Sequence, residues 1–160
     1  MTIPTPDMVV AKFVQDSLGP VILNVVRGRL VETMVKMALR DTGWRQCVPW
    51  QKSYDFEQDN TSLRLQVKSS CARIPKGVVR AATFDTSKRH LTDLYVFAYH
   101  PGIDEKTTDH RDPEQWEFHV MPTDGLPHRN RITLAEVRTL ARAVGYADLA
   151  QQLALVAAAE

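Results

Sequence analysis

The sequence predicts one α+β domain over residues 1–160, with a mixed β-sheet flanked by helices. Helical patterns occupy both ends of the chain and strand patterns fill its middle, an order typical of α+β folds. The chain has 44% hydrophobic and 24% charged residues, an ordinary globular balance. Its length is close to the commonest size of a single domain.

Two helices are expected at the start of the chain. The first begins at Thr5 and Pro6, with proline in the first helical position, and ends near residues 19–20. The second covers about residues 23–40, and Gly43 follows it as a stop signal. Apolar residues at helical spacing lie on two sides of this second helix, so we expect it to be largely buried against a sheet.

The middle of the chain predicts strands over residues 44–50, 53–57, 61–70, 92–100 and 115–121. In the third of these, Leu63, Leu65 and Val67 alternate with polar residues, which is typical of a half-buried strand. The run over 92–100 is continuously apolar and suits a central strand covered on both faces. Residues 71–89 carry no clear pattern, and residues 101–114 read as a long polar loop.

Two helices are expected to close the chain. Thr133 and Glu136 form the pattern of a capping box, which starts a helix that ends near Gly145. A last helix covers about residues 147–158.

Charge and cysteine content exclude several classes of protein. Lysine and arginine total 20 against 19 acidic residues, so any DNA contact must come from a local patch. Cys47 and Cys71 are too few for a disulfide framework, and reduced thiols in a cytoplasmic protein are the expectation. No apolar run approaches the ~20 residues that span a bilayer, and the start of the chain lacks a secretory pattern, so no membrane association is expected.

Three polar residues of the predicted strands suggest a chemical site. Gln66 and Lys68 are two positions apart and therefore project from the same face of their strand. The spacing from Asp55 to Gln66 leaves room for a hairpin between adjacent strands, which brings Asp55 to that face if the register allows. An acid, an amide and an ammonium would then converge.

Such a trio suits phosphodiester hydrolysis. A carboxylate holds Mg²⁺, or Mn²⁺ in its place, because hard cations prefer oxygen ligands. The metal polarises the phosphate and lowers the pKa of a bound water, while a lysine orients that water or stabilises developing charge. Glu32 adds a second carboxylate if its helix packs over this end of the sheet.

The pattern resembles the PD-(D/E)XK nuclease superfamily, which has a restriction-endonuclease-like fold. Residues 27–32 look like the family's glutamate-bearing helix, Asp55 matches its metal-binding aspartate, and Gln66-Val67-Lys68 matches its last motif. Segments 93–97 and 115–118 look like an uncharacterised bacterial branch of the same superfamily.

The resemblance implies a Mg²⁺-dependent DNA endonuclease with Glu32, Asp55, Gln66 and Lys68 as catalytic residues. Asp55 would be the main metal ligand, supported by Glu32, Gln66 and the backbone carbonyl of Val67. Lys68 would act on the attacking water. Because cutting both strands of DNA usually takes two sites, a homodimer is a further expectation.

The sequence departs from the family pattern at Gln66, which occupies the acidic position. An amide oxygen is a weaker metal ligand than a carboxylate, although some homing and repair nucleases of this superfamily use glutamine there. The alternative function is therefore a weakened or inactive nuclease-fold protein that binds nucleic acid or a protein partner. Tyr54 stands where the family often has proline, which changes little.

Other charged residues have two interpretations. Arg27, Arg29 and Arg64 are candidates for contacts with DNA phosphates; later basic residues could join them or simply lie scattered over the surface, namely Lys76, Arg80, Lys88 and Arg89. Glu32 could pair with Lys36 on its own helix. A group of histidine and aspartate residues fits no tight zinc spacing, so a solvated loop is favoured. The group consists of His100, Asp104, Asp109, His110 and Asp112.

Overall fold

The computed structural model describes residues 5–48, 52–73 and 81–160. The helices are α1 (Pro6–Ser17), α2 (Asn24–Ala38), α3 (Leu134–Leu140) and α4 (Leu149–Ala157). The strands are β1 (Trp44–Gln46), β2 (Phe56–Gln58), β3 (Arg64–Cys71), β4 (Thr83–Asp85), β5 (Leu94–His100), β6 (Glu117–Pro122) and β7 (Arg131–Thr133). Lys76, Arg80 and the expected end of the first strand at Pro49 lie outside the described residues.

The strands build a mixed sheet, which confirms the α+β fold class. The five-stranded sheet has the order β1-β2-β3-β5-β6. Strands β3 and β5 run parallel over seven residue pairs, and the other neighbours in this sheet are antiparallel. A separate two-stranded sheet pairs β4 with β7, and neither of these short strands was predicted.

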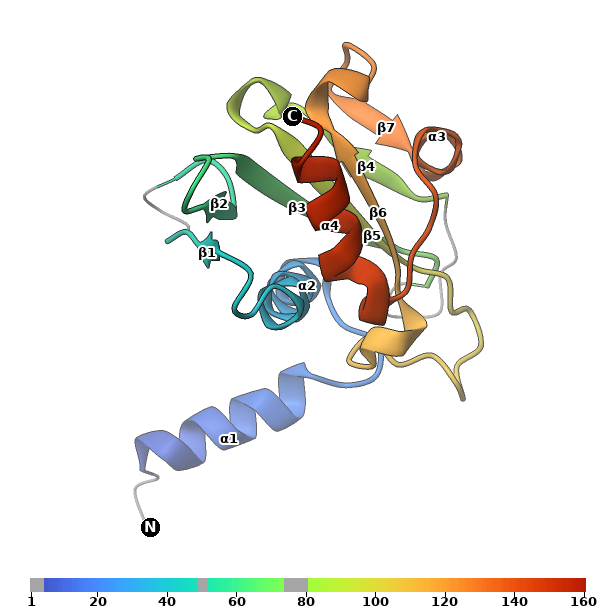
Figure 1. Ribbon diagram of the computed structural model, residues 1–160. Coiled ribbons are helices and arrows are strands. Elements are labelled where there is room, and N and C mark those ends of the chain that lie inside the picture. The colour runs from blue at the N-terminus through green and yellow to red at the C-terminus, as the bar shows by residue number, and fades with distance from the viewer. Residues whose placement is uncertain (1–4, 49–51, 74–80) are drawn as a thin grey trace.

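Both faces of the large sheet are covered (Figure 1). On one face, Leu65, Val67 and Val96 join a core with α2 and α4. On the other face, Tyr95 and Phe97 join a second core with β4, β7 and α3. All seven residues of β5 are buried, as its continuous apolar run predicts.

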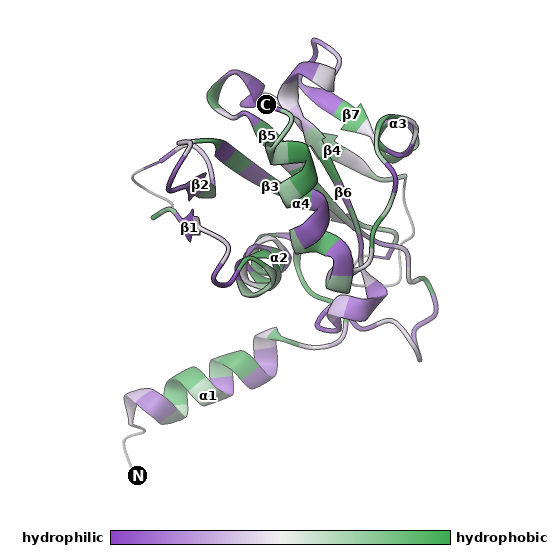
Figure 2. Ribbon diagram, in the orientation of Figure 1, coloured by the Kyte–Doolittle hydropathy of each residue, from purple (hydrophilic) through white to green (hydrophobic). Residues whose placement is uncertain are grey.

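Helix α1 stands apart from the rest of the protein (Figure 1). Thr5 caps it through its side chain, as predicted, but none of its residues is buried. Figure 2 shows hydrophobic and hydrophilic residues alternating along it. Phe13 is 63% exposed.

Helix α2 buries one side rather than two. Its buried residues are Arg27, Val31, Met34 and Val35, which follow one another at helical spacing. Met37 is 66% exposed, so the expectation of a helix buried on both apolar sides was wrong. The buried side packs on β3, and this contact sets α2 beside the strand that carries Gln66 and Lys68.

The segment between β5 and β6 is more buried than its polar sequence indicates. His100 and His110 are fully buried, and their rings lie 4.7 Å apart between centroids. The backbone N–H of Ile22 donates to His110 Nδ1 at 3.1 Å, and the indole of Trp116 donates to the His110 carbonyl at 2.9 Å. The expectation of a solvated loop was therefore wrong at this point, because Ile22, distant in sequence, donates to His110 and the Trp116 ring packs against both imidazoles.

Strand β3 has an open edge, and this edge positions the site. Strand β2 pairs only with its first two residues, through Phe56 with Leu65 and Glu57 with Arg64. From Gln66 onward, the side of β3 that faces away from β5 has no neighbouring strand among the described residues. Backbone groups on that side are available to side chains and ligands.

Candidate active site

Asp55 lies immediately before β2 and fills the start of the open edge of β3. Its backbone N–H donates to the Leu65 carbonyl at 3.0 Å. Its carboxylate oxygen Oδ2 accepts the backbone N–H of Val67 at 2.7 Å. Because the N–H and C=O of one strand residue point to the same side, the Val67 carbonyl also faces this edge.

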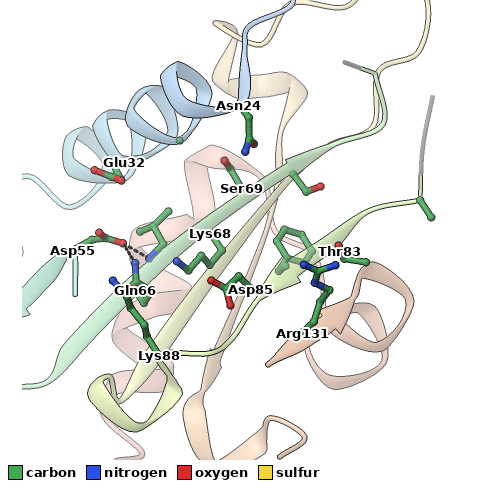
Figure 3. A pocket seen from close by; sticks show the side chains of 15 residues that line it. Asn24, Glu32, Asp55, Gln66, Lys68, Ser69, Thr83, Asp85, Lys88 and Arg131 are labelled. Carbon is green, nitrogen blue, oxygen red and sulfur yellow. Dashed lines mark hydrogen bonds between the residues drawn. The ribbon is translucent and has the colours of Figure 1, made fainter. Parts of the chain in front are cut away.

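Gln66 reaches the same carboxylate from the neighbouring position of β3. Its side-chain amide Nε2 donates to Asp55 Oδ2 (Figure 3). Its amide oxygen Oε1 is buried and has no hydrogen-bond partner among the described residues. A buried acceptor without a donor is unfavourable in the protein alone. Because the amide nitrogen faces Asp55, the side-chain amide has to turn over before this oxygen and Asp55 can bind one cation.

Burial raises the pKa of Asp55 to about 6, from an ordinary value of 3.8. The Val67 N–H opposes this rise, the negative charge of Glu32 adds to it, and the positive charges of Lys68 and Arg29 oppose it. A desolvated carboxylate in a cleft is typical of functional sites, and a nearby cation would stabilise its charged form.

Lys68 enters the cleft from the same face of β3 as Gln66, as the alternation predicts. Its ammonium is placed between Asp55 and Asp85 (Figure 3), and its positive charge opposes the rise in pKa that burial causes at both carboxyl groups. Lys68 is half-buried and forms no salt bridge within the described part of the chain. It is therefore available to interact with a bound anion.

Glu32 lies on α2, across from Asp55, and lines the same cleft. It does not pair with Lys36; it accepts a hydrogen bond from the guanidinium of Arg29 at 2.7 Å. Only 17% of its side chain is exposed. The packing of α2 on β3 thus brings a second carboxylate to the mouth of the site.

The cleft has a volume of about 530 Å³ and extends beyond the four predicted residues. Figure 3 shows Asn24 and Ser69 on one side and the β4–β7 ribbon on the other. The ribbon contributes residues that sequence reasoning missed, namely Thr83, Asp85 and Arg131. Lys88, one of the basic residues considered for phosphate contacts, lies in the turn after β4 and also lines the cleft. Strands of three residues carry too little alternation to be recognised, so only the acidic and basic residue types were visible beforehand.

The three arginines expected to contact DNA differ in their environments. Arg27 is fully buried and donates to the Ile22 carbonyl at 3.4 Å, so it is not available to DNA. Arg64 forms a bidentate pair with Asp93 at 2.8 and 2.9 Å, on the end of β3 away from Ser69. Arg29 is 56% exposed but is paired with Glu32.

The cleft offers oxygen ligands rather than a closed metal cage. Within the described residues, no group of three His, Cys, Asp or Glu side chains could hold a metal ion. The nearest donors are the Asp55 carboxylate, the orphaned Gln66 Oε1 and the Val67 carbonyl. Mg²⁺ is usually held by one or two carboxylates with waters and substrate phosphates completing its shell, so this donor set fits Mg²⁺.

Comparisons with known proteins give one structural likeness. No family model matches the chain, and no curated protein matches it. Among solved structures, a bacterial homing endonuclease, I-Ssp6803I, is similar with a TM-score of 0.48 and 21% sequence identity. The match covers 86% of this chain and 96% of that one. At this level of similarity the likeness carries no functional conclusion by itself. No helix in the described residues is long and apolar enough to cross a membrane.

Proposed function

We propose that this protein is a Mg²⁺-dependent nuclease that hydrolyses phosphodiester bonds in DNA. The observation that carries the proposal is the convergence of Asp55, Gln66 and Lys68 in one polar cleft at the open edge of β3. The order of these residues also resembles the PD-(D/E)XK motif. A buried carboxylate, a free amide oxygen and an unpaired ammonium are together suited to a cation and a phosphate.

Asp55 would hold Mg²⁺, with Gln66 Oε1 and the Val67 carbonyl as neutral ligands and Glu32 as a more distant support. When bound, the metal supplies Lewis-acid polarisation of the phosphate and a more acidic water. The Val67 N–H fixes the Asp55 carboxylate at 2.7 Å, so its orientation is set before a ligand arrives.

Lys68 would act on the water and on the phosphate. Its ammonium donates hydrogen bonds and stabilises the negative charge that develops on the phosphate oxygens in the transition state. Its position on β3, between the carboxyl groups of Asp55 and Asp85, limits its movement, so it can orient the attacking water. This role depends on a charged group at position 68 rather than on packing.

Plasmid cleavage tests the proposal. The wild type should convert supercoiled plasmid to nicked or linear forms in Mg²⁺, and EDTA should abolish the conversion. Lys68→Ala should lower the rate at least about 100-fold, the lower range for a positioned general acid–base group. Lys36→Ala is the matched control, since Lys36 is exposed on α2 outside the cleft and should leave the rate unchanged. Equal rates for the two variants would refute the proposed site.

A second candidate is a nucleic-acid-binding protein without catalysis. It is favoured by glutamine in the acidic motif position and by the lack of a three-residue acidic or thiol-imidazole metal group in the described residues. This candidate would be supported if the wild type and Gln66→Glu both bind DNA but cleave no duplex, single-stranded or branched substrate. Dimerisation stays a prediction, to be checked by sedimentation equilibrium.

A further inference from the structure

Unpaired cations gather at the cleft. Most arginines in the described chain form salt bridges with acids, namely Arg29, Arg45, Arg64, Arg73, Arg111, Arg129 and Arg138. Arg131 and Lys88 form no salt bridge and no side-chain hydrogen bond with any described residue. Both are exposed, and both line the cleft that holds Asp55 and Lys68.

Hydrogen bonds hold the β4–β7 ribbon that carries Lys88 and Arg131. Arg131 is the first residue of β7 and pairs across the ribbon with Asp85 of β4. The turn that carries Lys88 is tied to the segment before β7, since the Thr86 N–H donates to the Asn130 carbonyl at 2.9 Å. The Thr86 hydroxyl also donates to the Arg129 carbonyl, at 2.7 Å. The positions of the two cations are therefore set by the fold, although their long side chains remain free to adapt.

Lys88 and Arg131 bring the charges of the cleft lining into balance, which favours a polyanionic ligand. Three acidic residues line the cleft, namely Glu32, Asp55 and Asp85, against Lys68, Lys88 and Arg131. Without Lys88 and Arg131, the metal-free cleft would have three carboxylates in its lining, one of them paired with Arg29, against a single lysine. Phe84 is the aromatic side chain among the described lining residues and is only 2% exposed, so no base-stacking surface is offered there.

We propose that Lys88 and Arg131 form a phosphate subsite that binds the DNA backbone beside the scissile phosphate. This inference rests on the proposed function and adds the residues that hold the substrate strand. Arg131 lies across the cleft from Asp55, whereas the Lys88 side chain reaches toward Gln66, so the two cations of the subsite lie on either side of Lys68 (Figure 3). Contacts of this kind are independent of base sequence and release counterions from DNA.

The test is the salt dependence of DNA binding. Affinity for a labelled duplex is measured by fluorescence anisotropy in EDTA, so that no cleavage occurs, between 50 and 200 mM NaCl. Each phosphate contact contributes about 0.9 to the slope of log affinity against log salt. Loss of two contacts in Lys88→Ala/Arg131→Ala should reduce the slope by about 1.8. Over this fourfold change in salt, the wild type should lose about 12-fold more affinity than the double variant.

The matched control removes an equal charge elsewhere. Lys36→Ala/Arg40→Ala deletes one exposed lysine from α2 and one exposed arginine from the turn after it, outside the cleft. Its slope should equal that of the wild type. Three outcomes would each overturn the subsite. The slope of Lys88→Ala/Arg131→Ala could equal that of the wild type, the slope of the control could decrease by the same amount, or the wild type could fail to bind DNA.

Plasmid cleavage in Mg²⁺ separates this inference from the proposed function. Cleavage by the wild type together with an unchanged slope in Lys88→Ala/Arg131→Ala refutes the subsite and leaves the nuclease standing. A decreased slope with no cleavage under any condition supports the subsite and refutes the nuclease. Circular dichroism confirms that the variants are folded, as expected for exposed positions.

Discussion

Asp55→Asn is expected to stabilise the protein in the absence of metal. The Asp55 carboxyl has a pKa of about 6, raised chiefly by burial from its ordinary 3.8. A folded-state pKa above the unfolded value means that the folded protein binds the proton more tightly. Stability from this group is therefore greatest below pH 3.8, falls as the pH rises to about 6, and stays low above that.

The magnitude follows from the two pKa values. A tenfold change in proton affinity corresponds to about 1.4 kcal/mol, so ionised Asp55 destabilises the fold by about 3 kcal/mol at pH 7.5. Asparagine removes the charge and keeps an oxygen for the Val67 N–H. The same oxygen can also accept the hydrogen bond from the Gln66 side-chain amide.

Urea denaturation followed by circular dichroism, in EDTA, measures this effect. Asp55→Asn should exceed the wild type by up to about 3 kcal/mol at pH 7.5 and by close to zero at pH 4. Asp93→Asn provides the contrast, because hydrogen bonds from Arg64 lower the pKa of Asp93. That variant should be less stable than the wild type at pH 7.5, and the loss should shrink as the pH falls. An Asp55→Asn gain that is absent at pH 7.5, or equal at both pH values, refutes the reasoning.

Three further predictions concern metal binding, pH and packing. Gln66→Glu should tighten Mg²⁺ binding at least about fivefold in a calorimetric titration, since about 1 kcal/mol of added attraction supplies that factor; unchanged affinity would remove Gln66 from the ligand set. Burial lowers the pKa of His110 to about 4. As the pH falls from 6.5 to 4, the wild type should therefore lose up to about 3 kcal/mol of unfolding free energy relative to His110→Gln, measured in urea. Parallel pH profiles of the two proteins would contradict this. Phe118→Ala, at a fully buried position, should lower the free energy of unfolding by about 3–5 kcal/mol, whereas exposed Phe13→Ala should change it by less than about 0.5 kcal/mol; similar losses would show that α1 is covered in solution.

Patterns within single segments were enough to predict most of the large elements and the shared strand face of two residues that line the candidate site. The continuous apolar run of β5 predicted a strand buried on both faces, and Thr133 with Glu136 predicted the capping box of α3. Alternation in β3 placed Gln66 and Lys68 on one face. These features could be predicted because side-chain direction in a strand and hydrogen bonding at a helix end depend on neighbours only a few residues away.

Only the tertiary structure decided which polar residues are exposed and which surround the cleft. Arg27 and His110 are polar in sequence but fully buried, and they meet at Ile22, whose N–H donates to His110 and whose carbonyl accepts from Arg27. Arg131 and Lys88 reach the cleft through the pairing of β4 with β7, two strands that are far apart in the chain and only three residues long. Such placement depends on long-range contacts that leave no periodic pattern in the sequence, since each short strand is held by its partner rather than by its own residues.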